Sequence, residues 1–167
     1  MIVGIMSDSH GDAAATALAV RLLLDRGAKK LFHCGDICGE NVLAELANHD
    51  CTFVWGNCDH PTPALRSYVA ALGLPCPSGP QRCVLSGKHI ALYHGHERGF
   101  HRASEESGLA YIFYGHTHRR SDREENGCRL INPGALHRAN VRTVALLDLR
   151  TGSLSFLAID TGEIVSL

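Results

Sequence analysis

The stretch that decides the fold is Met1-Ile-Val-Gly-Ile-Met-Ser-Asp-Ser-His-Gly-Asp12. Its apolar run, Ile2 to Met6, has the length and boundaries of a buried strand, although periodicity alone does not separate a strand from a helix. Asp8 and His10 follow, and in an extended backbone two residues so spaced project from the same face. A carboxylate beside an imidazole at a strand end is a common start of a metal site. Taken alone, the pair is more often a solvated turn, so partners must come from later segments.

The composition is that of an ordinary globular protein, and we expect residues 1–167 to form one domain. Apolar residues make up 45% of the chain, charged residues 20%, and the net charge is −1. This charge argues against general binding to nucleic acid or membrane, and no apolar run is as long as a membrane span. The start lacks a basic signal-peptide region, and a domain of this size does not need its seven cysteines paired. We therefore expect a cytoplasmic protein with reduced thiols.

The predicted elements alternate in the first half and become β-rich in the second. In the first half, the patterns predict strands over 2–6, 31–34 and 51–55 and helices over 13–26, 40–48 and 63–72. In the second half they predict a weak helix over 100–107, a polar loop or hairpin tip over 119–127, and strands over 82–85, 89–93, 110–114, 128–132, 143–148 and 154–160.

This order of elements predicts an α/β fold, namely a four-layer α-β-β-α sandwich of two facing mixed sheets flanked by helices. The first half would build a βαβαβ unit with parallel strands and right-handed crossovers. The second half would build a mostly antiparallel meander.

Five of the predicted strands end in a potential metal ligand. These ligands are Asp8 with His10, Asp36, Asn57, His94, and His116 with His118. The neighbouring glycines at 35, 56, 95 and 115 permit tight turns and close backbone approach. Each motif alone is more often a simple turn or a solvated histidine. Together they predict one site, because open α/β folds place their ligands at the carboxyl ends of strands.

The motifs, taken together, resemble the calcineurin-like metallophosphoesterases. They are Asp8-Ser-His10, Gly35-Asp36, Gly56-Asn57-Cys58-Asp59, His94-Gly95-His96 and Gly115-His116-Thr117-His118. Asn132-Pro133-Gly134 also matches a segment of that family, with Ala135 where a serine is common. The chain length and the Gly-Asn-Cys-Asp variant look most like the small single-domain bacterial and archaeal phosphodiesterases. The resemblance implies hydrolysis of a small or nucleotide-type phosphodiester, in preference to a monoester.

The resemblance also implies a dinuclear metal centre. Asp8, His10 and His118 would bind one ion, Asn57, His94 and His116 would bind the other, and Asp36 would bridge both. Oxygen and imidazole ligands without thiolate suit manganese, nickel, iron or zinc better than calcium, and manganese is the metal we expect. Two such ions clamp an in-line displacement at phosphorus, with a bridging hydroxide as the nucleophile and Asn57 positioning the phosphoryl oxygens.

Cys58 is the one informative departure from the family pattern. Many larger relatives have a histidine there, which is assigned to protonating the leaving oxygen. A thiol of ordinary pKa would donate weakly, so His96 and His60 are the nearest candidates for a replacement acid, although a solvated loop histidine is commoner. We expect Asn57, Cys58 and His96 to contact the substrate, and Asn57, Asp36 and His96 to take part in catalysis.

Other candidates for a site are weaker. A phosphate could also be bound by one of several arginines, which are more often solvated: Arg98, Arg102, Arg119, Arg120 and Arg138. Cys34 and Cys38 lack the second pair that a zinc site needs, so a buried thiol is the better interpretation.

Two other classes of function stay open. Retromer-associated relatives of the same fold act as non-catalytic scaffolds through protein contacts, but they have lost part of the ligand set, whereas all seven ligand positions are filled here. A nuclease is the third hypothesis. A net charge of −1 argues against it, because it provides no excess of positive charge to bind a long nucleic acid. We expect a small-molecule substrate, no membrane or nucleic-acid partner, and, by analogy with small relatives, a homo-oligomer.

Overall fold

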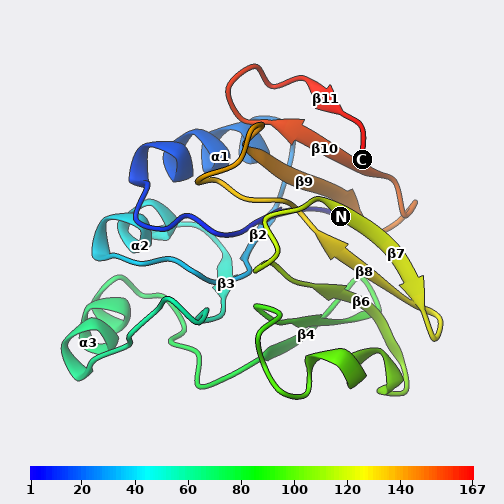
Figure 1. Cartoon of the computed structure of the whole chain (residues 1–167), viewed down its shortest axis with the longest axis horizontal. Coiled ribbons are helices and arrows are strands. Elements are labelled where there is room, and N and C mark those ends of the chain that lie inside the picture. Colours follow the sequence, from blue (N-terminus) through cyan, green and yellow to red (C-terminus); the bar gives the residue numbers. More distant parts are fainter.

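The computed structural model describes residues 1–167 as two facing β-sheets with helices on their outer sides (Figure 1). The first sheet has six strands in the order β11-β10-β9-β1-β2-β3, and the second has five in the order β4-β5-β6-β8-β7. This arrangement confirms the predicted four-layer α/β sandwich. No helix has the length and apolarity needed to cross a membrane.

The bounds of the elements follow the predicted ranges closely in most places. The first sheet and its helices consist of β1 (Ile2–Met6), α1 (Ala13–Asp25), β2 (Lys30–His33), α2 (Glu40–Leu46), β3 (Cys51–Phe53), α3 (Pro63–Ala71), β9 (Thr143–Asp148), β10 (Leu154–Ala158) and β11 (Ile164–Val165). The second sheet and its short 3₁₀ helix consist of β4 (Gln81–Leu85), β5 (Lys88–Leu92), η1 (Phe100–Glu105), β6 (Leu109–Phe113), β7 (Ser121–Glu125) and β8 (Cys128–Asn132).

The N-terminal strand lies in the middle of the first sheet. It pairs in parallel with β2 and antiparallel with β9, and β2 continues in parallel to β3. Gly4 faces α1, and a Cβ there would lie 2.8 Å from Leu23 Cδ1, so the helix packs directly on the strand backbone. Helix α1 begins where the Asp12 carboxylate accepts a hydrogen bond from Ala15 N at 2.9 Å.

Alternate residues of the strands face two different apolar layers. Val3, Ile5 and Phe32 face the space between the sheets, where they pack with residues of the second sheet such as Phe113 and Ile131. Residues on the other face of the first sheet, such as Met6, Leu31 and Phe53, pack against α1 and α2. A third apolar cluster includes Tyr93, Ala103 and Tyr114 and lies under η1. The period of two along each strand therefore produces the layers.

The second half is mostly antiparallel, as predicted, but it is not a single meander, and that part of the prediction is wrong. β5 and β6 are parallel, and so are β6 and β8, because η1 and the β7 segment provide the long return connections that parallel strands need. β9, β10 and β11 do not join the second sheet at all. They extend the first sheet beside β1.

The polar segment 119–127 is a strand for much of its length, not only a loop. Ser121–Glu125 forms β7, an edge strand antiparallel to β8, and the hairpin tip falls at Asn126 and Gly127, both of which have positive φ. Its charged residues misled the prediction. Charges on an edge strand, however, are a common protection against pairing with another chain.

Candidate metal centre

The predicted ligand positions meet where the two sheets come together at the ends of their strands. Backbone hydrogen bonds join the loops after β1 and β2: Asp8 N donates to Gly35 O at 3.0 Å, and His10 N donates to Asp36 O at 2.9 Å. The second sheet is tied in by His116 N, which donates to Asp8 Oδ2 at 3.1 Å. Residues more than a hundred positions apart in the chain therefore share one site.

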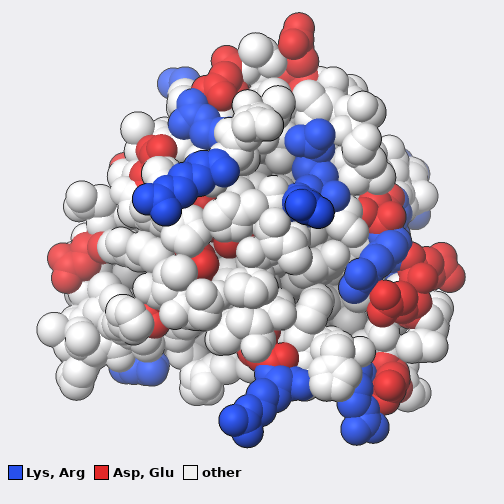
Figure 2. All heavy atoms as spheres, viewed as in Figure 1, with Lys and Arg blue, Asp and Glu red and all other residues white.

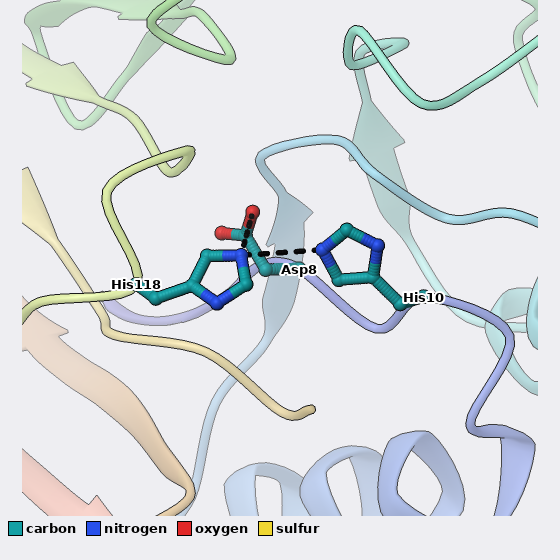
Figure 3. Close-up of side chains that lie close together, drawn as sticks. All are labelled: Asp8, His10 and His118. Carbon is teal, nitrogen blue, oxygen red and sulfur yellow. Dashed lines mark hydrogen bonds and ion pairs between the residues drawn. The ribbon is translucent and has the colours of Figure 1, made fainter. Parts of the chain in front are cut away.

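Asp8, His10 and His118 form the first group (Figure 3). The two rings turn one nitrogen each toward the other, with 3.2 Å between His10 Nε2 and His118 Nε2. His118 Nε2 also lies 3.3 Å from Asp8 Oδ1. Asp8 is fully buried, and its Oδ1 accepts no hydrogen bond. A buried oxygen without a donor, facing two imidazole nitrogens, fits a bound cation.

Asp36 lies between this group and a second one. Its Oδ2 is 3.5 Å from His10 Nε2, and its Oδ1 is 3.4 Å from His94 Nε2. Asn57 Oδ1 lies 3.0 Å from the same His94 nitrogen, and the ring of His116 is 5.1 Å from that of His94 between centroids. The two carboxylate oxygens of Asp36 thus face two different sets of ligand atoms, which is the arrangement a bridging carboxylate needs.

The charges of the site follow from burial and from these contacts. Burial raises the pKa of Asp8 and lowers that of His10. Burial would also raise the pKa of Asp36, but hydrogen bonds from His94 and from the backbone N–H of Cys58 outweigh it and hold that pKa well below its usual range. His10 is therefore neutral and Asp36 ionised near neutral pH, and these are the forms that bind metals.

Several orienting contacts hold the ligands, and the sequence did not reveal them. His94 Nδ1 lies 2.7 Å from Cys34 O and donates to it, so Nε2 is the ring nitrogen that faces the site. The Glu97 carboxylate accepts from the backbone N–H groups of His94 at 2.8 Å and Gly95 at 2.7 Å. Glu97 falls two residues after a motif glycine, and that position alone carries no distinctive signal.

Asp59, the last residue of Gly-Asn-Cys-Asp, joins the loops after β2 and β3. Its buried carboxylate accepts from Gly56 N at 2.7 Å, Cys38 N at 2.7 Å and Ile37 N at 3.2 Å. Asp59 is part of the Gly-Asn-Cys-Asp motif, but the motif alone did not indicate that its carboxylate joins the two loops. His137 is a further neighbour that the sequence did not single out, with its ring 5.9 Å from that of His10.

The backbone at the ligands is not extended, which corrects one step of the sequence reasoning. Five ligand residues have positive φ, between 43° and 68°: Asp8, His10, Asp36, His116 and His118. Each such residue costs about 1–2 kcal/mol, and Asp and His are among the residue types that tolerate it best. Side chains two apart therefore meet through tight left-handed turns, not through the alternation of a strand. Strain of this kind is concentrated at functional sites.

The remaining predicted residues lie around the rim. Cys58 is an exposed residue, and its Sγ lies near His10 and Asp36. Partial desolvation of the thiol, together with its contact with Asp36, raises the pKa of Cys58. His96 is also exposed, with its ring 5.3 Å from His94 and 6.3 Å from His116. His60 is exposed and makes no side-chain hydrogen bond.

The weaker candidates separate by location. Cys34 is buried between the sheets whereas Cys38 is exposed beside Cys58, so they form no zinc pair. Arg98 is exposed, and Arg102 pairs with Glu105 at the surface at 3.0 Å. The other three arginines, Arg119, Arg120 and Arg138, line a hollow beside His118.

His33, fully buried behind the site, leads to a prediction about pH. Gly35 N donates to its Nδ1, so its Nε2 donates to Ser9 Oγ at 2.8 Å and the ring is neutral. Burial, with His94 nearby, lowers its pKa from 6.5 to about 3. Between pH 6.5 and about pH 3, His33 binds a proton in the unfolded chain but not in the folded chain. The free energy of unfolding therefore falls as pH drops through this window, by about 1.4 kcal/mol per pH unit.

We expect His33→Gln to remove this contribution. Between pH 7 and pH 5 the wild type should lose roughly 2 kcal/mol more stability than the variant, as measured by urea unfolding of the metal-free proteins. Equal losses in both proteins would show that His33 is not held neutral in the folded chain.

The fold and the cluster together define a class of two-sheet α/β proteins with carboxylates and imidazoles gathered at strand ends. Within that class, the chain belongs to the calcineurin-like phosphoesterase superfamily, whose domain model matches residues 1–152. The expected family is thereby confirmed.

Individual relatives agree with this assignment. Phosphodiesterase MJ0936 of Methanocaldococcus jannaschii is 27% identical over 154 residues, which cover 89% of this chain and 93% of that protein. A solved structure described as a novel archaeal phosphodiesterase superposes with a TM-score of 0.84 at 22% identity, covering 99% of this chain and 100% of that one.

Two further solved structures share the fold. YfcE, a phosphoesterase from E. coli, has a TM-score of 0.77 at 24% identity and covers 99% and 97% of the two chains. Vps29 from Entamoeba histolytica, described with zinc, has a TM-score of 0.67 at 21% identity and covers 99% and 96%. At these identities the likeness shows the fold alone.

Proposed function

We propose that the chain is a phosphodiesterase that uses two divalent metal ions, manganese first among them, to hydrolyse a small or nucleotide-type phosphodiester. The observation that carries the proposal is the position of Asp36, whose two carboxylate oxygens face His10 on one side and His94 on the other. Seven free cysteines support a reducing compartment such as the cytoplasm.

The chain's own donor atoms support the assignment of the metals. Asp8, His10 and His118 would bind one ion, Asn57, His94 and His116 would bind the other, and Asp36 would bind both. The unpartnered Oδ1 of Asp8 and the facing Nε2 atoms of His10 and His118 form a set of ligand atoms that one cation would satisfy together. When bound, such ions supply Lewis acidity, which stabilises charge on the phosphoryl oxygens and activates water.

The protein groups around the metals bind and orient the substrate. The Asn57 amide directs Oδ1 to His94 and places Nδ2 3.4 Å from Cys58 Sγ, so its N–H groups lie on the exposed side, where a phosphoryl oxygen would accept from them. Cys58 lines the same side and keeps its proton, because its thiol pKa is raised. His96 stands at the rim beside His94 and His116, where its ring is accessible to protonate a leaving oxygen.

A non-catalytic scaffold of the same fold, acting through protein contacts, is the second candidate function, because the fold alone does not separate it from an enzyme. A phosphodiesterase would hydrolyse a phosphoester catalytically, and a scaffold would not. A scaffold has no use for Asn57 and His96 on the exposed side of the centre, whereas a phosphodiesterase needs such donors beside the metals.

The two functions are separated by an assay with paired synthetic esters. We expect the manganese-loaded protein to hydrolyse bis(p-nitrophenyl) phosphate roughly tenfold or more faster than p-nitrophenyl phosphate, as judged by kcat/KM, and the metal-free protein to hydrolyse neither. A folded, metal-loaded protein without activity on either ester would favour the scaffold.

A further inference from the structure

A hollow of about 480 Å³ adjoins the metal centre and plays no part in the function described so far. Thr117 and His118 form the side toward the metal ligands, and Arg119, Arg120 and Arg138 contribute most of its charge. No aspartate or glutamate lines it, and the terminal carboxylate of Leu167 is the one negative group among its lining residues. The hollow is therefore continuous with the centre through His118, and it carries excess positive charge.

The three arginines come from two separate segments. Arg119 and Arg120 precede β7, and Arg138 belongs to the loop between β8 and β9. Figure 2 shows basic side chains gathered over both segments on this face of the molecule. A group bound between the two segments would therefore meet guanidinium groups from two directions.

These arginines lack the partners that most other arginines of the chain have. None of the three lies within ion-pair distance of a carboxylate. Six others do, and they are Arg82, Arg102, Arg123, Arg129, Arg142 and Arg150. Arg120 donates from Nη2 to Ser166 O at 3.0 Å, but its Nε is buried and has no acceptor. A buried N–H without an acceptor is costly, so Arg120 is not fully satisfied by its contacts within the chain.

We propose that this hollow binds a second phosphate group of the substrate. The inference rests on the proposed function: the diester to be cleaved lies at the metal centre, and a further phosphate lies beyond His118 between Arg119, Arg120 and Arg138. Guanidinium groups suit this role because their paired N–H donors match phosphate oxygens. Val141, which is 44% exposed, gives the hollow an apolar wall for the uncharged part of the substrate. The substrate class is thus a phosphodiester of nucleotide size that carries an additional phosphate.

The test compares two esters with the same reacting group, the p-nitrophenyl ester of thymidine 5′-phosphate and its 3′-phosphorylated form. We expect the wild type to prefer the form with the second phosphate, and Arg119→Gln/Arg138→Gln to reduce the ratio of the two kcat/KM values by roughly tenfold per guanidinium removed. Arg150→Gln, at an exposed arginine paired with Asp148, serves as the matched control and should keep the wild-type ratio.

A second measurement needs no turnover. Sulfate added to the metal-free protein should shift the Arg120 Nε–H signal in NMR spectra in a saturable way, with affinity reduced roughly tenfold in the double variant. A wild-type preference ratio near one, or an Arg120 signal that sulfate leaves unchanged, overturns the inference while the phosphodiesterase stands. If neither ester is cleaved, the proposed function fails, and the sulfate titration alone decides whether the hollow binds phosphate-like anions.

Discussion

Asp36→Asn is expected to lower kcat/KM on bis(p-nitrophenyl) phosphate by roughly a thousandfold or more. The substitution keeps the size of the side chain but removes its negative charge, and it replaces one of the two oxygens that face His10 and His94 with an N–H donor group. Both proposed metal positions would be weakened at once. Substitutions at Asp8 or His118 would disturb one position directly.

Asp50→Asn is the matched control for the Asp36 variant. Asp50 is exposed and pairs only with Lys30 at the surface, an interaction that contributes at most about 1 kcal/mol. This variant should retain wild-type activity. Comparable activity in the Asp36 and Asp50 variants would mean that the chemistry does not pass through the carboxylate between the two groups of ligands.

Gly56→Ala is expected to damage the site without changing any polar group. Gly56 has an ordinary φ, but a Cβ at this position would overlap the carboxylate and backbone nitrogen of Asp36. The loop after β3 or Asp36 itself must move, and such overpacking costs about 1–3 kcal/mol of stability. A displaced catalytic group also lowers the rate, so we expect a loss of roughly a hundredfold in kcat/KM.

Thermal unfolding and steady-state rates of Gly56→Ala would be compared with those of Gly99→Ala, where an added Cβ meets nothing within 4 Å. The Gly99 variant should behave as wild type. Equal activity of the two variants would mean that the loop after β3 accommodates a Cβ at position 56 despite the close approach of Asp36.

The position of the site could be predicted from the sequence because strand ends are readable. Apolar runs such as Ile2–Met6 stop abruptly at polar residues, and parallel strands bring their carboxyl ends to one edge of a sheet. Asp8, Asp36 and His94 could therefore be assigned to one place without any knowledge of distances. The expected metal preference rests on ligand chemistry in the same way, and it stays a prediction.

The rest depended on properties that a single sequence does not display. An alternating pattern says which face of a strand is buried but not which strand lies beside it, so the parallel pairing of β6 with β8 was missed. Positive φ at Asp8 or His116 is dictated by the loops around them. The roles of Glu97 and Asp59 arise from backbone N–H groups, which every residue has and no motif marks.

The central claim is that the chain holds two metal ions around Asp36, and metal content after dialysis tests it most directly. The wild type, loaded with manganese and dialysed against metal-free buffer, should retain close to two ions per chain by elemental analysis, and Asp36→Asn should retain clearly fewer under the same conditions. Fewer than one ion per wild-type chain, after loading with manganese or with nickel, would contradict the claim.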